Sequence, residues 1–184
     1  MKTTTEQVPG SDVEVRPARP DEIERLRAID DDAATLYAEH GIAIVLDSDH
    51  VFSRTELERW QRAAELQQVF LALDAAGNDL GFAALELACG EPYLDQLSVR
   101  RAAMRRGLGT RLLSRSIAWA REGGGTVLWL TTYRHLPFNL PYYGRHGFVT
   151  VPDDSCSPGI RAHLEEQRHF LPKPTERVAM RLAL

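Results

Sequence analysis

The segment from residue 91 to 133 constrains the fold most, because it reads as a strand, a helix and a second strand in succession. "EPYLDQLSV" (91–99) has the pattern of a strand, and an amphipathic helix begins near Leu108 after a glycine-containing turn. "GGG" (123–125) ends that helix, and "TVLWLTTY" (126–133) is a nearly continuous apolar strand. Two strands joined by a crossover helix are parallel and right-handed, so the chain contains a β-α-β unit.

The rest of the chain predicts an α/β (α+β) fold with a mixed sheet. The turn "AGND" joins two apolar runs into a β-hairpin, and Ser53 with Glu56 has the spacing of a capping box for the second helix. We expect a mostly antiparallel, twisted sheet with helices on both faces and the β-α-β unit at its centre. The other expected elements are strands at 13–19, 69–88 (the hairpin), 148–151 and 176–184, and helices at 20–41, 52–68, 136–147 and 160–170.

Length and composition predict one domain in a reducing compartment. The 184 residues fit a single domain, which we place at 13–184 after a flexible polar tail at 1–12. No apolar run reaches the roughly 20 residues that span a bilayer, and the first residues lack the apolar core of a signal peptide, so we expect a cytoplasmic protein. Cys89 and Cys156 have no paired spacing that would indicate a disulfide framework or a zinc site.

A cluster of arginines precedes the glycine turn. "VRRAAMRRGLGTRLL" (99–113) places four arginines within seven residues, in a chain whose net charge is −4. Glycines allow an oxyanion to approach the unpaired N–H groups at a helix N-terminus, and arginines add positive charge. The turn therefore predicts a pyrophosphate site. The same sequence would also be found if the glycines only marked the start of a helix and the arginines only faced solvent. The residues of the predicted site are Arg105, Arg106, Gly107, Leu108, Gly109 and Thr110.

The stretch "LDQLSVRRAAMRRGLGTRLL" (94–113) resembles the central motif of the GNAT N-acetyltransferase superfamily. In that motif a strand leads through a glycine loop into a helix, and the loop amides hold the pyrophosphate of acetyl-coenzyme A. The resemblance implies acetyl-coenzyme A as co-substrate, no metal, and a thioester carbonyl held at the strand end Leu97-Ser98-Val99. Met104 departs from the family, which usually has glutamine or arginine at that position.

A second stretch, "PFNLPYYGRHGF" (137–148), resembles the later motif of the same superfamily. The resemblance implies that Asn139 contacts the cofactor and that Tyr143 lies beside its sulfur, whereas Tyr142 is assigned to packing. The implied reaction is acetyl transfer to a primary amine, by direct attack through a tetrahedral intermediate. In it Tyr143 donates a proton to the departing thiolate. The element order fits the family from about Val13 onward.

The base that deprotonates the amine is left open between two carboxylates. Glu86 and Asp95 lie inside apolar strand runs, where a charge faces either water or a cleft. Strict alternation places Asp95 on the same face as Leu97 and Val99. The acidic run 30–32 could attract an amine, but it also has the composition of a solvated helix face.

Two further segments bear on the site. His163 and His169 are six residues apart, so they do not share a helical face and do not indicate a metal site. The excursion 152–174 is expected to cover the acceptor side and to be mobile, since it contains several prolines.

Two other functions use the same residues. A catalytically weak domain of this fold could bind coenzyme A as a sensor or partner-binding module. A nucleic-acid module could use Arg100, Arg101, Arg105 and Arg106, but the acidic net charge argues against it. We therefore expect a small-molecule or peptide amine as partner and neither nucleic acid nor membrane. A homodimer is compatible with the resemblance. The sequence does not identify the amine.

Overall fold

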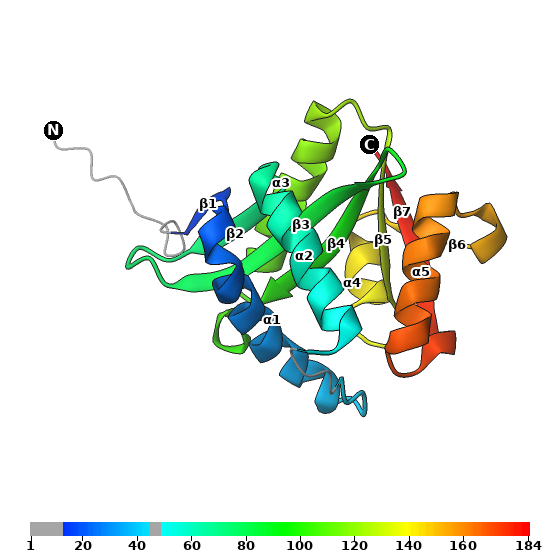
Figure 1. Cartoon of the computed structure of the whole chain (residues 1–184), viewed down its shortest axis with the longest axis horizontal. Helices are drawn as coiled ribbons and strands as arrows, with labels where there is room; N and C mark the ends of the chain where they lie inside the picture. Colours follow the sequence, from blue (N-terminus) through cyan, green and yellow to red (C-terminus); the bar gives the residue numbers. More distant parts are fainter. Residues whose placement is uncertain (1–12, 45–48) are drawn as a thin grey trace, which may run out of the picture.

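A computed structural model describes residues 13–44 and 49–184, in which the strands form one mixed sheet (Figure 1). The strand order is β1-β2-β3-β4-β5-β7-β6, and every neighbouring pair is antiparallel except β4 and β5, which are parallel. This confirms the expected fold class; the expected tail at 1–12 lies outside the described residues. The strands are β1 (Glu14–Pro17), β2 (Val69–Leu73), β3 (Asp79–Ala88), β4 (Glu91–Val99), β5 (Val127–Tyr133), β6 (Val149–Val151) and β7 (Arg177–Ala183).

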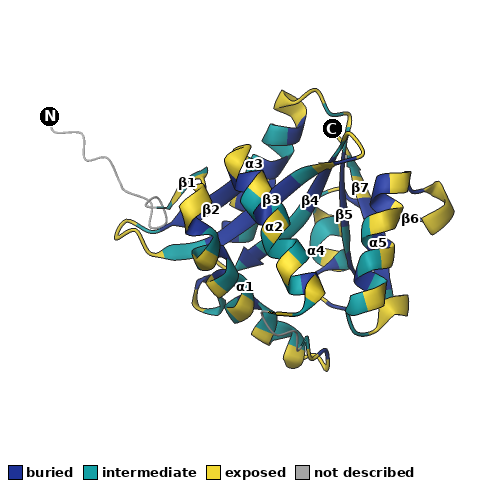
Figure 2. Cartoon of the chain, viewed as in Figure 1, coloured by how far each residue is buried: buried dark blue, intermediate teal, exposed yellow. Residues whose placement is uncertain are grey.

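Helices cover both faces of the sheet, as expected. On one face lie α1 (Ile23–Ala38), α2 (Val51–Glu65) and α5 (Pro158–Phe170); on the other lie α3 (Leu108–Glu122) and α4 (Leu140–Arg145). The strands carry most of the buried residues between these layers (Figure 2). Leu112 and Leu113 of α3 pack on one side of the sheet and Trp60 of α2 packs on the other.

Two irregularities in β4 open the centre of the sheet. Its pairing with β5 covers only Tyr93 and Leu94, although both strands continue beyond that point. Directly after Leu94 a β-bulge interrupts the pairing with β3, so that Asp95 is the extra residue. The two strands are therefore unpaired with each other beyond Leu94, which leaves a gap between the two halves of the sheet.

The bulge also changes which face Asp95 occupies. Asp95 and Gln96 both bond to the helices of the α1/α2 face, whereas Leu97 and Val99 pack toward α3. The expectation from strict alternation, that Asp95 shares a face with Leu97 and Val99, is therefore wrong. A bulge places two successive side chains on one side, and periodicity alone does not reveal it.

One local expectation is wrong and another is confirmed. Helix α2 begins at Val51, and the His50 side chain caps it by accepting a hydrogen bond from the Phe52 amide at 3.1 Å, so Ser53 and Glu56 do not form a capping box. The helix expected at 160–170 is confirmed, because α5 covers Pro158–Phe170 and buries Ile160 and Leu164 completely; the expected mobility of 152–174 stays a prediction.

Candidate active site

A cavity of about 1050 Å³ lies at the gap between β4 and β5 and has lining residues from both faces of the sheet. On the α3/α4 face it is lined by the loop between β4 and α3 and by Tyr142 and Tyr143. On the α1/α2/α5 face it is lined by polar and charged side chains from those helices and the neighbouring strands, among them Asp30, Glu56 and Arg177. The cavity thus joins two chemically different compartments through the sheet.

The glycine loop turns sharply into the N-terminus of α3. Gly107 is the N-cap of α3, with a φ of 77° that favours glycine, and Arg105 has a φ of 61°. A Cβ atom added to Gly109 would lie 3.1 Å from the Tyr142 hydroxyl oxygen, so this position is crowded. Of the cofactor-binding residues expected from the sequence, all except Arg106 line the cavity.

The unpaired edge of β4 offers backbone groups to the same cavity. The Arg100 amide donates to the Leu80 carbonyl on β3 at 2.8 Å. Because N–H groups alternate in direction along a strand, those of Leu97 and Val99 face away from β3, toward the gap. The Ser98 side chain points to the α1/α2 face of the sheet, where its hydroxyl donates a hydrogen bond to the Asp30 carboxylate.

Some arginines of the cluster form ion pairs within the protein, and some line the cavity. Arg100 forms an ion pair with Asp79 of β3. Arg101 pairs with Glu39 at 2.6 Å, and its amide donates to the Asp32 carboxylate at 2.6 Å. Arg100 and Arg101 therefore attach the loop between β4 and α3 to its surroundings, and Arg101 and Arg105 line the cavity. The residues of the acidic run 30–32 serve different purposes: Asp31 is exposed, whereas Asp30 and Asp32 bind polar groups of β4 and the loop.

The second motif places two side chains at the gap. Asn139 is buried, and its amide nitrogen donates to the Tyr37 hydroxyl oxygen of α1 at 3.3 Å. Tyr143 is half-buried, lines the cavity and packs its ring 5.7 Å from that of Phe148. Burial raises the pKa of the Tyr143 phenol well above its ordinary value, so the hydroxyl stays protonated at neutral pH.

Three carboxylates form what we call the acidic wall: Asp30, Glu56 and Asp95. Burial raises the pKa of each, and the negative charges of Asp30 and Asp95 raise the pKa of Glu56 further, well above its ordinary value. Asp95 is fixed by the Trp60 indole, which donates to it at 3.1 Å, and by Arg59 at 3.7 Å. Sequence reasoning missed Glu56, because its position near the start of a helix matched a capping pattern.

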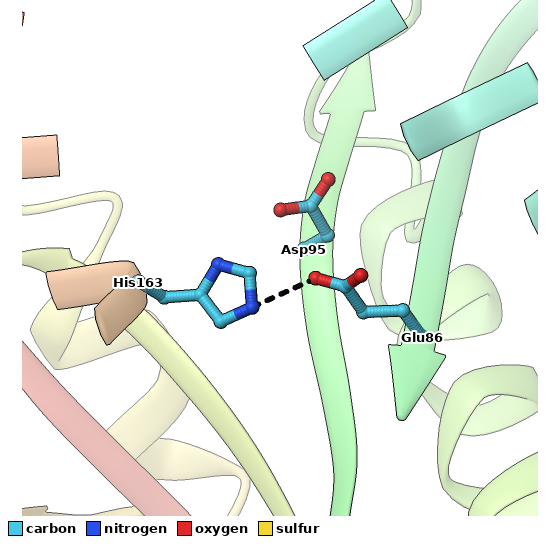
Figure 3. Close-up of side chains that lie close together, drawn as sticks. All are labelled: Glu86, Asp95 and His163. Atoms are coloured by element: carbon cyan, nitrogen blue, oxygen red, sulfur yellow. Dashed lines mark ion pairs between the residues drawn. The ribbon is translucent and has the colours of Figure 1, made fainter. Parts of the chain in front are cut away.

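Glu86, the other carboxylate expected from the sequence, is turned toward α5. Its carboxylate pairs with His163 at 2.9 Å, as the close-up in Figure 3 shows, and it does not line the cavity. The possible ligand atoms of Glu86, Asp95 and His163 lie within 4.8 Å of one another, a grouping from three elements that sequence spacing did not indicate. Arg59 already supplies a positive charge beside Asp95.

The wall opposite the acidic wall comes from β5, β7 and α5. Arg177, at the start of β7, donates to Thr131 at 3.3 Å and to Gln167, and its guanidinium lies over the Tyr133 ring at 4.6 Å. Arg177 was also missed, although a charge inside the apolar run "ERVAMRLAL" is the same signal that indicated Glu86 and Asp95.

The comparison with protein families decides the classification. The model of the family described as "Acetyltransferase (GNAT) family" matches residues 42–148, more than half of the chain. This chain belongs to the acetyltransferase (GNAT) family. The match includes the glycine loop and the segment with Asn139 and Tyr143, so the family's two motifs lie on the cavity described above.

Solved structures of GNAT proteins share the fold at low sequence identity. An acetyltransferase from Streptococcus agalactiae matches with a TM-score of 0.70 and 14% identity, over 95% of this chain and 99% of that one. The PaiA N-acetyltransferase from Thermoplasma acidophilum, solved with coenzyme A, has a TM-score of 0.67 and 15% identity, over 94% and 99%. N-acetylglutamate synthase from Neisseria gonorrhoeae, solved with coenzyme A and N-acetyl-glutamate, has a TM-score of 0.63 and 18% identity. The match covers 94% of this chain but only 35% of the synthase.

Among the described residues of this GNAT protein, no helix is both long and apolar enough to cross a lipid bilayer.

Proposed function

We propose that this GNAT protein is an acetyl-coenzyme A-dependent N-acetyltransferase that acts on a primary amine. The observation that carries the proposal is the cavity at the gap between β4 and β5, because it connects the glycine loop before α3 on one face with an acidic wall on the other. The proposed reaction is direct attack of the amine on the acetyl group through a tetrahedral intermediate.

The residues at the loop fit coenzyme A. Arg105 of the glycine loop and Arg145 of α4 line the cavity, and the N-terminus of α3 adds its unpaired amides and partial positive charge. The backbone amides of Leu97 and Val99 face the gap and would hold the amide-bearing arm of coenzyme A. Acetyl-coenzyme A supplies the thioester carbonyl that the amine attacks. Met104 lines the cavity without a polar group, so backbone amides carry the phosphate contacts here.

The acidic wall prepares the amine. An ammonium group has a pKa near ~10 and must lose a proton before it attacks. Asp95, fixed by Trp60 and Arg59, attracts the ammonium, and Glu56 takes the proton, because burial and neighbouring carboxylates raise its pKa above that of an ordinary glutamate and make it a stronger base. Glu86 holds His163 instead.

Tyr143 assists the departing thiolate. Complete proton transfer to a thiolate is uphill, because a phenol has a pKa near ~10 and a thiol near ~8.5, and burial widens this difference. We therefore assign the Tyr143 hydroxyl a hydrogen bond to the sulfur that strengthens as negative charge develops. This modifies the role expected from the sequence, which was a completed proton transfer.

The test is release of free thiol from acetyl-coenzyme A in the presence of a library of primary amines, with calorimetric binding of coenzyme A measured in parallel. We expect micromolar coenzyme A binding and amine-dependent thiol release. Tight binding without turnover of any amine would favour the alternative, a coenzyme A-binding sensor of the same fold. Absence of coenzyme A binding would overturn both.

A further inference from the structure

Arg177 is a buried cation whose contacts are neutral. Only 7% of the residue is exposed, yet none of the ion pairs among the described residues includes it. Its partners are the oxygens of Thr131 and Gln167 and the face of the Tyr133 ring, and its Nε atom is buried without a hydrogen-bond partner. It nonetheless lines the cavity.

Such an arrangement is costly in a protein without ligand. A buried charge without an opposite charge loses its hydration and gains little in return, so buried arginines normally have a carboxylate partner. Arg59, on the same face and with 10% of its side chain exposed, follows that rule, because it pairs with Asp95 and with Glu166 at 2.9 Å. Arg177 can therefore still form an ion pair with an anion. Because Arg177 lines the cavity, an anionic group of a ligand in the cavity can reach it.

Resting on the acetyltransferase function proposed above, we infer that the acceptor is an amino acid whose carboxylate binds Arg177 while its amine faces the acidic wall. Arg177 and the acidic wall both lie on the α1/α2/α5 face of the sheet, and they come from opposite sides of the gap. A molecule with one amine and one carboxylate matches this division of charge. A guanidinium binds a carboxylate through two parallel hydrogen bonds, so the contact also fixes the direction of the amine.

The neighbouring polar groups support this direction. Gln167 and Thr131 hold the guanidinium in place through hydrogen bonds, and the Tyr133 ring supports its plane. The Arg177 guanidinium lies 4.6 Å from the centre of the Tyr133 ring, and the centre of that ring lies 6.0 Å from the ring centre of Tyr37, the partner of Asn139. A carboxylate on Arg177 would thus lie within reach of a substrate whose amine is at the gap.

The experiment measures binding and turnover separately. The complex with coenzyme A is titrated with the twenty protein L-amino acids and with the carboxamide of each, and melting temperature and calorimetric affinity are recorded. At least one amino acid should bind at least tenfold more tightly than its own carboxamide. In Arg177→Gln this discrimination should disappear, and in Arg177→Lys, which keeps the charge, it should be partly retained.

The outcomes distinguish the inference from the proposed function. Arg177-dependent binding of an amino acid without acetyl transfer would support the carboxylate site at Arg177 and overturn the transferase function, and with it the role of the amino acid as acceptor. Efficient acetylation of amines that lack a carboxylate, with no discrimination between acids and carboxamides, would do the reverse. If the arginine is only structural, Arg177→Gln should melt at a lower temperature and keep the discrimination. We expect its unliganded form to melt at the same temperature or higher. The comparison of acids with carboxamides on the unaltered chain decides the question even if Arg177→Gln does not fold.

Discussion

Two regions of this molecule bury charge in opposite ways. At the edge of the sheet Glu22, 2% exposed, receives hydrogen bonds from the Arg16 side chain at 2.7 and 2.8 Å, from Arg25 at 2.8 Å and from the Arg19 amide at 2.8 Å. In the cavity, Arg177 has only neutral partners and Glu56 lies near two other carboxylates. The charge of Glu22 is balanced by the arginines around it. The charges of Arg177 and Glu56 are not balanced in this way, and a substrate can supply the opposite charges.

The pKa values show the same contrast. The arginines lower the pKa of Glu22 to about 2, whereas burial and neighbouring carboxylates raise that of Glu56 well above its ordinary value. A group whose charge is stabilised in the folded state contributes to stability, and a group whose charge is destabilised costs stability. We therefore expect changes at Glu22 to lower stability and leave activity unchanged, and changes in the cavity to lower activity while stability stays the same or rises.

Glu56→Gln should give the largest effect on activity, because it removes the proposed base without changing shape. The loss of kcat/KM is expected to be roughly 10²- to 10⁴-fold, the usual range for a general base. In the unaltered enzyme the rate should fall as pH drops through the raised pKa of Glu56, and this acid limb should disappear in the variant. Glu86→Gln is the comparison, and a larger loss there would return the base role to Glu86.

Tyr143→Phe should reduce turnover by about 10²-fold, because the ring and its packing remain while the hydroxyl is lost. Coenzyme A affinity, measured by calorimetry, should stay within a few-fold of the original. Tyr142→Phe is the matched control, since the Tyr142 hydroxyl lies against Gly109 rather than at the sulfur position that the family motif implies for Tyr143. Reversed effects of the two substitutions would contradict the assignment.

Glu22→Gln should destabilise the fold by about 2 kcal/mol and leave kcat and KM unchanged, because charged hydrogen bonds are lost far from the cavity. The folded-state pKa of Glu22 lies below its unfolded value, so its contribution is fully present above about pH 4.5 and is lost as pH falls toward 2. Urea unfolding at several pH values measures this. The variant should show a flatter acid dependence, and an unchanged dependence would refute the account.

Gly109→Asp should weaken coenzyme A binding at least tenfold, about 1.4 kcal/mol, the smallest of the four effects. The new carboxylate repels phosphate, and its Cβ would lie 3.1 Å from the Tyr142 hydroxyl oxygen. Gly109→Ala separates the two causes, since it adds the crowding without the charge. Equal losses in both variants would mean that packing against Tyr142, rather than an anion, explains the glycine.

The sequence was sufficient for most elements and for the glycine turn that begins α3, because apolar periodicity and glycines act locally. It was insufficient where one residue changes the geometry or where partners come from distant elements. The bulge at Asp95 leaves no trace in a hydrophobic pattern. The candidate roles of Glu56 and Arg177 become recognisable only once the fold places residues of α2, β4, β5 and β7 around one cavity. The pairing of Asn139 with Tyr37, 102 positions apart, could not be predicted for the same reason.

The bulge in β4 has a consequence for how such a cleft can arise. Asp95 is one additional residue, and a chain without it would keep every other side chain of β4 on its present face, because regular alternation would be restored between Leu94 and Gln96. A straighter β4 could then continue its ladder with β5 beyond Leu94 and close the sheet. The insertion of one residue can thus convert a continuous sheet into a divided one. The inserted residue, Asp95, also places a carboxylate on the lining of the cavity at that division.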